Sequence, residues 1–103
     1  MTELGPGAGL EILGFEFDAR NTSHFSHGLT ETIVWDVWAG DFGLFFNPPA
    51  PTRSGTHLMI GPDSGGRHWT IVVVEVDAEH GVWRPITGWP STQKEIDAWH
   101  ASS

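Results

Sequence analysis

The segment from Arg67 to Asp77 constrains the fold more than any other part of the chain. It holds the longest unbroken apolar run, Ile71 to Val74, and every residue of that run is β-branched. Such residues lose little in an extended backbone and pack well on a pleated surface. Turn-forming residues bound the run, Pro62 to Gly66 before it and Glu79 to Gly81 after it. We therefore expect a strand that is covered on both faces.

Other segments predict partners for this strand. Thr56 to Ile60 and Val82 to Thr87 complete an antiparallel meander with the apolar strand at its centre. Glu11 to Phe17 alternates unevenly and is expected to pair with an edge of the meander. A strand beginning at Leu44 has to stop at Asn47, because prolines follow. After Thr87, the residues Gly88 to Pro90 predict a turn.

Two helices are predicted between the first strand and the meander. Asp18 is a suitable N-cap for a short helix from Ala19 to Ser26, and Gly28 suits its end. Thr30 is a suitable N-cap for a second helix, from Glu31 to about Ala39, with apolar residues at helical spacing.

A third helix is predicted at the end of the chain. Ser91 or Thr92 caps it, and Thr92 and Glu95 stand at capping-box spacing. Ile96 and Trp99 are expected to rest on the sheet. The order strand, two helices, three strands, helix is typical of an α+β fold, with helices packed on an antiparallel sheet of about four strands.

The whole chain has the size and composition of one small domain. At 103 residues and 39% hydrophobic content it suits a single core, and we expect a flexible glycine-rich leader over residues 1–9 before one α+β domain over 10–103. It contains no long apolar run and no secretory signal pattern. It also contains no cysteine, so we expect a cytoplasmic protein without membrane contact.

The formal net charge of −8 is unusual for a protein that binds nucleic acid, because binding to a polyanion is normally driven by a basic face. The acidity either keeps a small domain soluble or matches a basic partner protein. The basic residues are few and scattered: Arg20, Arg53, Arg67, Arg84 and Lys94.

Asn21, His24 and His27 follow one another at intervals of three residues, so a short helix would carry them on one face. A metal site needs a third ligand besides the two histidines, and the sequence supplies no convincing one. We therefore predict no metal and no other cofactor. In the structural interpretation, Asn21 and His24 bind loop backbone, which leaves a functional role open for His27.

Two further pairs suit phosphate chemistry. Arg67 and His68 follow a glycine-rich turn whose N–H groups suit a phosphate, although a solvated hairpin turn explains them equally well. Arg84 and Thr87 lie on the last predicted strand, where a cross-strand pair with Glu75 would also explain Arg84. A metal-free nuclease needs a general base, a general acid and cations, and histidine and arginine supply them.

The tryptophan content is high for a chain of this length. Six tryptophans in so short a chain either cover a sheet too small to bury itself or contribute to a binding surface. Trp35 and Trp38 lie on the second predicted helix, and Trp83, Trp89 and Trp99 are expected near one end of the sheet. An aromatic pocket near Trp89 would suit a small molecule.

The order of these features resembles the BrnT-like toxins of bacterial type II toxin–antitoxin systems, over about residues 11 to 100. The resemblance rests on an ordered set of short motifs: Phe15-Glu16-Phe17-Asp18, Asn21, His24, His27-Gly28, Gly66-Arg67, Arg84-Pro85-Ile86-Thr87, Glu95 and Trp99.

The resemblance implies a RelE-like α+β fold and metal-independent ribonuclease activity. For this activity we expect His27 or His68 in acid–base catalysis and Arg67 and Arg84 binding phosphate. The resemblance also implies neutralisation by a ribbon-helix-helix antitoxin that binds operator DNA, in a dimer or a heterotetramer. The matching positions are Asn21, His24, His27, Arg67, Arg84, Thr87 and Glu95.

The chain also departs from the family pattern. It has Gly88-Trp89 where an arginine is usual, only Lys94 as a cation in its final helix, and an acidic total charge. Loss of one phosphate-facing arginine costs several kcal/mol of transition-state stabilisation. The alternative is thus a catalytically inactive domain of the same fold. It would bind an antitoxin-like partner through exposed tryptophans and an acidic face, with Asn21, His24, Trp89, Glu95 and Trp99 in structural or binding roles.

Overall fold

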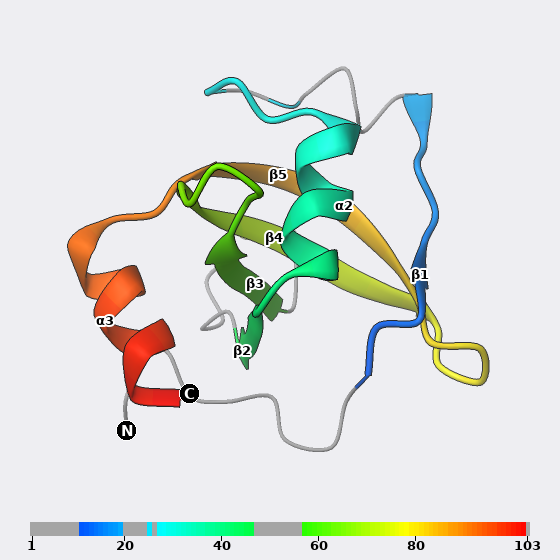
Figure 1. The fold of residues 1–103 in the computed structure, drawn as a ribbon. Helices are drawn as coiled ribbons and strands as arrows, with labels where there is room; N and C mark the ends of the chain where they lie inside the picture. The colour runs from blue at the N-terminus through cyan, green and yellow to red at the C-terminus, as the bar shows by residue number, and fades with distance from the viewer. Residues whose placement is uncertain (1–10, 20–24, 26, 47–56, 103) are drawn as a thin grey trace, which may run out of the picture.

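The computed structural model describes residues 11–19, 25, 27–46 and 57–102 (Figure 1). The predicted leader and most of the helix predicted over 19–26 lie outside the described residues. Within the described part, one five-stranded sheet and two helices follow the chain in the order β1 (Gly14–Phe15), α2 (Glu31–Ala39), β2 (Gly43–Phe46), β3 (His57–Pro62), β4 (His68–Asp77), β5 (Val82–Pro90) and α3 (Gln93–Ser102).

The sheet has the strand order β1-β5-β4-β3-β2, so β4 is central, as predicted. The meander of β3, β4 and β5 is antiparallel, and β2 extends it in the same sense. β1, however, pairs with β5 in parallel, so the predicted antiparallel arrangement holds for β2 to β5 but is wrong for β1, and the sheet has five strands where about four were predicted. The described structure is α+β with a mixed sheet.

The first strand is shorter than predicted because two backbone carbonyl groups of this segment accept hydrogen bonds from tryptophan side chains and not from a neighbouring strand. The carbonyl oxygen of Glu11 accepts a hydrogen bond from the indole of Trp83 at 3.0 Å. The carbonyl oxygen of Ile12 accepts one from the indole of Trp38 at 2.9 Å. Regular pairing of this segment is therefore confined to Gly14–Phe15.

The last strand is longer than predicted, since Gly88 to Pro90 continue β5 and do not form a turn. Gly88 lies opposite Ile71, and a Cβ atom there would come within 2.9 Å of the carbonyl oxygen of Thr70 and 3.0 Å of Leu29. This glycine permits a close approach to β4 and is not a turn residue.

The two helices cover opposite faces of the sheet (Figure 1). Alternate residues of β4 point to the two faces, so Trp69, Ile71 and Val73 join the core under α2 while Val72 joins the core under α3. The central strand is thus covered on both sides, as its apolar run predicts. The core on the α2 side contains Ile12, Leu29, Val34, Val37, Met59, Trp69, Ile71, Val73 and Trp83. The core on the α3 side contains Phe45, Leu58, Ile60 and Val72.

Helix α2 has the bounds that the sequence predicts. The hydroxyl of Thr30 accepts a hydrogen bond from the amide of Ile33 at 3.2 Å, and Val34 and Val37 are buried against the sheet. Helix α3 begins after Thr92, which exchanges hydrogen bonds with Glu95 in the predicted capping box. Within the described chain, neither helix has the length and apolar character needed to cross a membrane.

Candidate functional site

The two arginines expected to bind one phosphate lie far apart. Arg67 immediately precedes β4, whereas Arg84 lies opposite Val74. Val74 is seven positions after Arg67, which corresponds to roughly 23 Å of extended strand at about 3.3 Å per residue. The guanidinium of Arg67 stacks on Trp69, in the α2-side core, while Arg84 follows Trp83 of that same core and so points to the other face. The two arginines do not form one phosphate site.

Arg84 is engaged with carboxylates of the first strand segment. Its guanidinium donates a hydrogen bond to Glu16, which raises the pKa of Arg84, and the negative charge of Asp18 acts in the same direction. The predicted pairing with Glu75 is wrong, because Glu75 lies opposite Trp83 on the α2 side. Alternation along the strand separates the two side chains.

Arg67 belongs to a turn that is organised by the carboxylate of Asp63. One oxygen of Asp63 accepts hydrogen bonds from the amides of Gly65 and Arg67 at 2.9 and 3.0 Å, and the other accepts the indole N–H of Trp69 at 2.9 Å. The bond from Trp69 is the main reason that the pKa of Asp63 is lowered. The amides of Gly65 and Arg67, which the phosphate hypothesis needs, therefore already bind a carboxylate of the chain itself.

The histidines that the sequence selects are also separated. His68 packs against Trp99 of α3, with ring centroids 4.5 Å apart, so it faces the α3 side. His27 lies in a turn with a φ of 60°, an uncommon backbone conformation for a residue other than glycine. The next residue, Gly28, lies beside Trp69 in the α2-side core. Asn21 and His24 lie outside the described residues.

Three of the other predicted site residues, Trp89, Glu95 and Trp99, hold α3 against the rest of the fold. Trp89 donates its indole N–H to both carboxylate oxygens of Glu95, at 3.1 and 3.2 Å. Trp99 donates to the carbonyl oxygen of Asp41 at 2.6 Å. Thr87 is half-buried opposite Val72, at the centre of the same face. Trp89, Glu95 and Trp99 thus have structural roles in this arrangement.

Tryptophan indoles also hold together segments that are distant in the sequence. Trp69 and Trp83 are buried, which confirms that part of the tryptophan content covers the sheet. Of the six tryptophans, all described, five donate an indole hydrogen bond, namely Trp38, Trp69, Trp83, Trp89 and Trp99. The sixth, Trp35, is instead 39% exposed, on the surface of α2.

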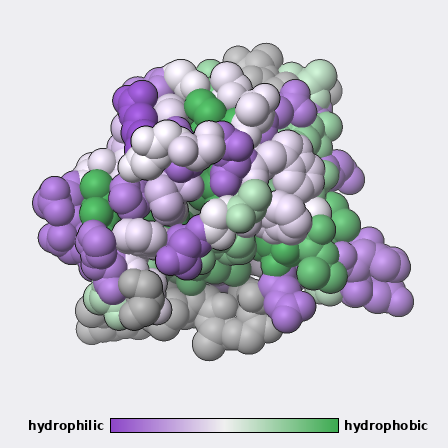
Figure 2. Space-filling view, viewed as in Figure 1, coloured by the Kyte–Doolittle hydropathy of each residue, from purple (hydrophilic) through white to green (hydrophobic). Residues whose placement is uncertain are grey.

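Trp35 belongs to an apolar surface that we call the β1 flank, formed by Phe15, Phe17 and Trp35 and extended by exposed Leu13, which lies beside Gly81 of the β4–β5 turn. Its ring centroid lies 5.0 Å from that of Phe15 and 6.0 Å from that of Phe17. Leu13 is 63% exposed, the highest value among the exposed large hydrophobic residues of the described chain. The space-filling view shows apolar surface over the start of β1, beside the hydrophilic β4–β5 turn (Figure 2). An exposed apolar patch rimmed by polar residues is typical of an interaction site.

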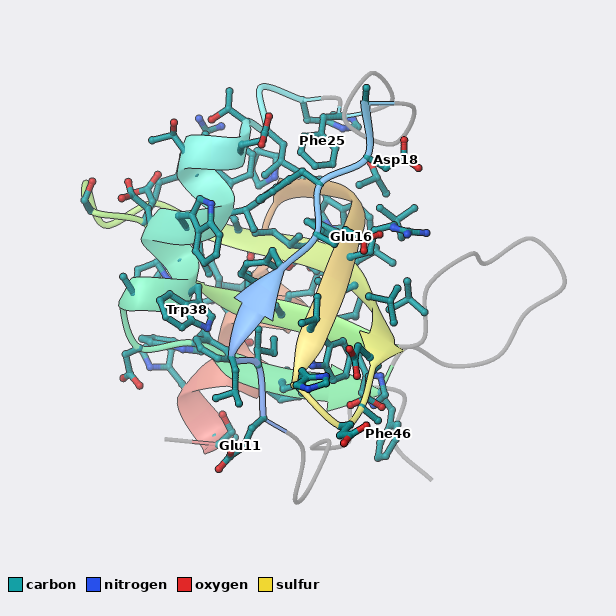
Figure 3. All side chains as sticks on the ribbon, turned by 90° about the vertical axis from the view of Figure 1, so that its right-hand side faces the viewer. Glu11, Glu16, Asp18, Phe25, Trp38 and Phe46 are labelled. Carbon is teal, nitrogen blue, oxygen red and sulfur yellow. The ribbon has the colours of Figure 1, made fainter. Side chains whose placement is uncertain are left out.

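Carboxylates flank this apolar surface. Glu16 and Asp18 alternate with Phe15 and Phe17, so they lie on the other face of the same edge, and exposed Glu11 precedes them (Figure 3). The sequence indicates this surface only through Trp35 and the alternation of Glu11 to Phe17. It does not show which edge of the sheet stays uncovered, because that depends on pairing between residues about 68 positions apart.

The described residues contain no group of three histidine, aspartate or glutamate side chains placed to hold a metal ion. The exposure of Leu13 and Trp35 makes the β1 flank the candidate site that the geometry favours. Comparisons with protein-family models, with curated proteins and with solved structures find no match to this chain.

Proposed function

We propose that this chain is a protein-binding module whose β1 flank receives a basic segment of a partner protein. In the terms of the family resemblance, it is a catalytically inactive RelE-like domain that binds an antitoxin-like chain in the cytoplasm. The observation that carries the proposal is the exposure of Leu13 and Trp35 at an edge of the sheet whose other face carries Glu16, with exposed Glu11 earlier in the same segment.

Two physical arguments support this proposal. Aromatic residues at the centre of a patch with charged residues at its rim are the usual composition of a protein interface. A net charge of −8 favours encounter with a basic partner and repels nucleic acid. Such binding should weaken as salt is added, since screening shortens the range of exposed charges.

The ribonuclease that the resemblance implies is the weaker proposal. Arg67 and Arg84 lie on opposite faces of the sheet, and each already contacts a group of this protein, Trp69 and Glu16 respectively. Catalysis of phosphodiester cleavage by electrostatic stabilisation needs cations directed at one developing charge. This activity is tested directly by overproducing the protein and measuring cell growth and the integrity of cellular RNA.

The binding proposal is tested by capturing partners from source cells with the wild-type protein and two lysine variants. Trp35→Lys removes an exposed ring of the β1 flank and adds a repulsive charge. Phe46→Lys makes the same kind of change at another exposed aromatic residue, on β2 at the opposite edge of the described sheet.

We expect a partner whose sequence is basic, retained by wild type and by Phe46→Lys, lost with Trp35→Lys, and released by salt. Recovery of an acidic partner, or equal retention by both variants, would contradict the proposal. Unfolding midpoints of both variants confirm that each is folded under the capture conditions.

A further inference from the structure

The edge of β1 presents backbone as well as side chains. In the described structure, β1 is the terminal strand of the sheet and pairs only with β5 (Figure 3). The amides of Gly14 and Glu16 point toward β5, donating to Gly81 and Trp83 at 3.3 and 2.8 Å. Because successive amides of a strand alternate in direction, the N–H and C=O groups of Phe15 point away from β5. This edge can accept a further strand.

The side chains along this edge differ between the two faces of the sheet. Phe15 and Phe17 lie on the α2 side with Trp35. This alternation does not extend to Leu13, because the amides of Leu13 and Gly14 both donate to the carbonyl oxygen of Gly81 and the Leu13 side chain lies beside Gly81. Glu16 lies on the other face, where it pairs with Arg84. A strand added here would therefore place every second side chain on apolar groups and the others near carboxylates.

From this arrangement we infer that the partner segment binds by strand addition to β1 and alternates apolar and basic residues. The inference rests on the proposed function and adds the binding mode and the sequence pattern of the partner. Neighbouring side chains on adjacent strands lie about 5 Å apart, close enough for contact with Phe15 on one face and Glu16 on the other. Backbone hydrogen bonds supply affinity in this mode, and alternate side chains supply specificity.

The charge on the second face determines which occupant fits. Glu16 is 52% exposed on this face even in its ion pair with Arg84, and the chain as a whole has a formal net charge of −8. A lysine or arginine from the added strand suits this carboxylate. A second copy of this chain is the poorer occupant, because pairing β1 with itself would bring its carboxylates near those of the copy, and like charges across strands are unfavourable.

The test uses synthetic peptides of about eight residues, a common strand length. One peptide alternates valine and lysine, and the control has the same composition with the valines and lysines in separate blocks. A third peptide has the alternating order with every backbone nitrogen methylated, so that it cannot donate a backbone hydrogen bond to β1 in either direction of pairing. Binding is followed by NMR titration and by hydrogen exchange of the Phe15 amide in the full chain.

We expect the alternating peptide to bind at least about tenfold more tightly than either control, a difference of about 1.4 kcal/mol. It should also slow exchange of the Phe15 amide about tenfold. Trp35→Lys, which replaces the ring in contact with Phe15, should weaken this binding about tenfold, whereas Phe46→Lys, a lysine on the opposite edge strand, should leave it unchanged.

Equal affinity of the three peptides, unchanged exchange at Phe15, or equal effects of the two lysine variants would each overturn the inference. A different result would contradict the proposed function, so the two can be distinguished. If the natural partner is retained in a manner that depends on Trp35 while the peptide results are negative, the β1 flank binds a partner by another geometry. If the natural partner is retained equally by Trp35→Lys, the proposed function itself is wrong.

Discussion

The α3-facing side of the sheet and the β1 flank differ in how their side chains are used. The α3-facing side holds several residues that the sequence selects for chemistry, including His68, Trp89 and Trp99, and the contacts of these residues hold the fold together. The β1 flank exposes Leu13 and Trp35, and their exposed area contributes little to folding. Residues suited to catalysis thus serve packing, whereas the surface available to a partner lies at the edge of the sheet.

The largest expected effect separates a structural tryptophan from an exposed one. Trp83→Ala should lower the free energy of unfolding by about 3–5 kcal/mol, because its ring is fully buried and its indole holds Glu11. Trp35→Ala should cost about 1 kcal/mol, since much of that ring contacts solvent. Urea unfolding measures both values. Similar losses in the two variants would contradict the distinction between a structural Trp83 and an exposed Trp35.

The next effect concerns the attachment of α3. Trp89→Phe keeps most of the ring but removes the N–H that Glu95 accepts, so unfolding should become easier by about 1 kcal/mol. Binding of the partner and of the alternating peptide should not change. Loss of binding in this variant, with the fold intact, would mean that the α3-facing side takes part in recognition.

A smaller effect should appear as a pH dependence of stability. Burial lowers the pKa of His57, and this outweighs the opposing influence of Glu75. The unfolded chain therefore binds a proton more readily than the folded one, and stability should fall as pH decreases below about 6.5. His57 packs between Phe46 and Trp83, so His57→Phe preserves an aromatic ring at that position.

The measurement is the urea midpoint at several values between about pH 7.5 and 5.5, the range in which histidine changes its charge. Wild type should lose more stability over this range than His57→Phe, with exposed His80→Gln as the control. A midpoint that rises relative to His57→Phe as the pH falls would show that the folded protein favours the charged imidazole.

The smallest expected effect is on RNA. Arg67→Gln and Arg84→Gln should leave growth and RNA integrity as they are with the wild-type protein, because the two cations lie on opposite faces of the sheet. RNA cleavage by wild type that either substitution abolishes would restore the ribonuclease proposal and weaken the comparison made above.

Local signals in the sequence predict much of the fold. The bounds of α2, the capping box of α3 and the central position of β4 follow from capping residues, apolar spacing and β-branched content. Two predictions fail where a long-range contact decides the structure. Gly88 continues a strand because β4 approaches it closely, and the segment from Glu11 uses its carbonyls to bind indoles.

The candidate site is less predictable than the fold for the same reason. Residue types identify Arg67, Arg84 and His68 as suited to phosphate chemistry, but their separation depends on the register of β4 with β5. The β1 flank depends on parallel pairing of Phe15 with Trp83, 68 residues away in the chain. Neither relation leaves a local pattern in the sequence.

The most direct measurement of the central claim is oxidative footprinting of the free protein and of its complex with the captured partner. The claim predicts that Trp35 and Leu13 are labelled in the free protein and protected in the complex, while Arg67 and His68 keep their labelling. Protection of the Arg67–His68 turn, with Trp35 labelled equally in both states, would contradict it.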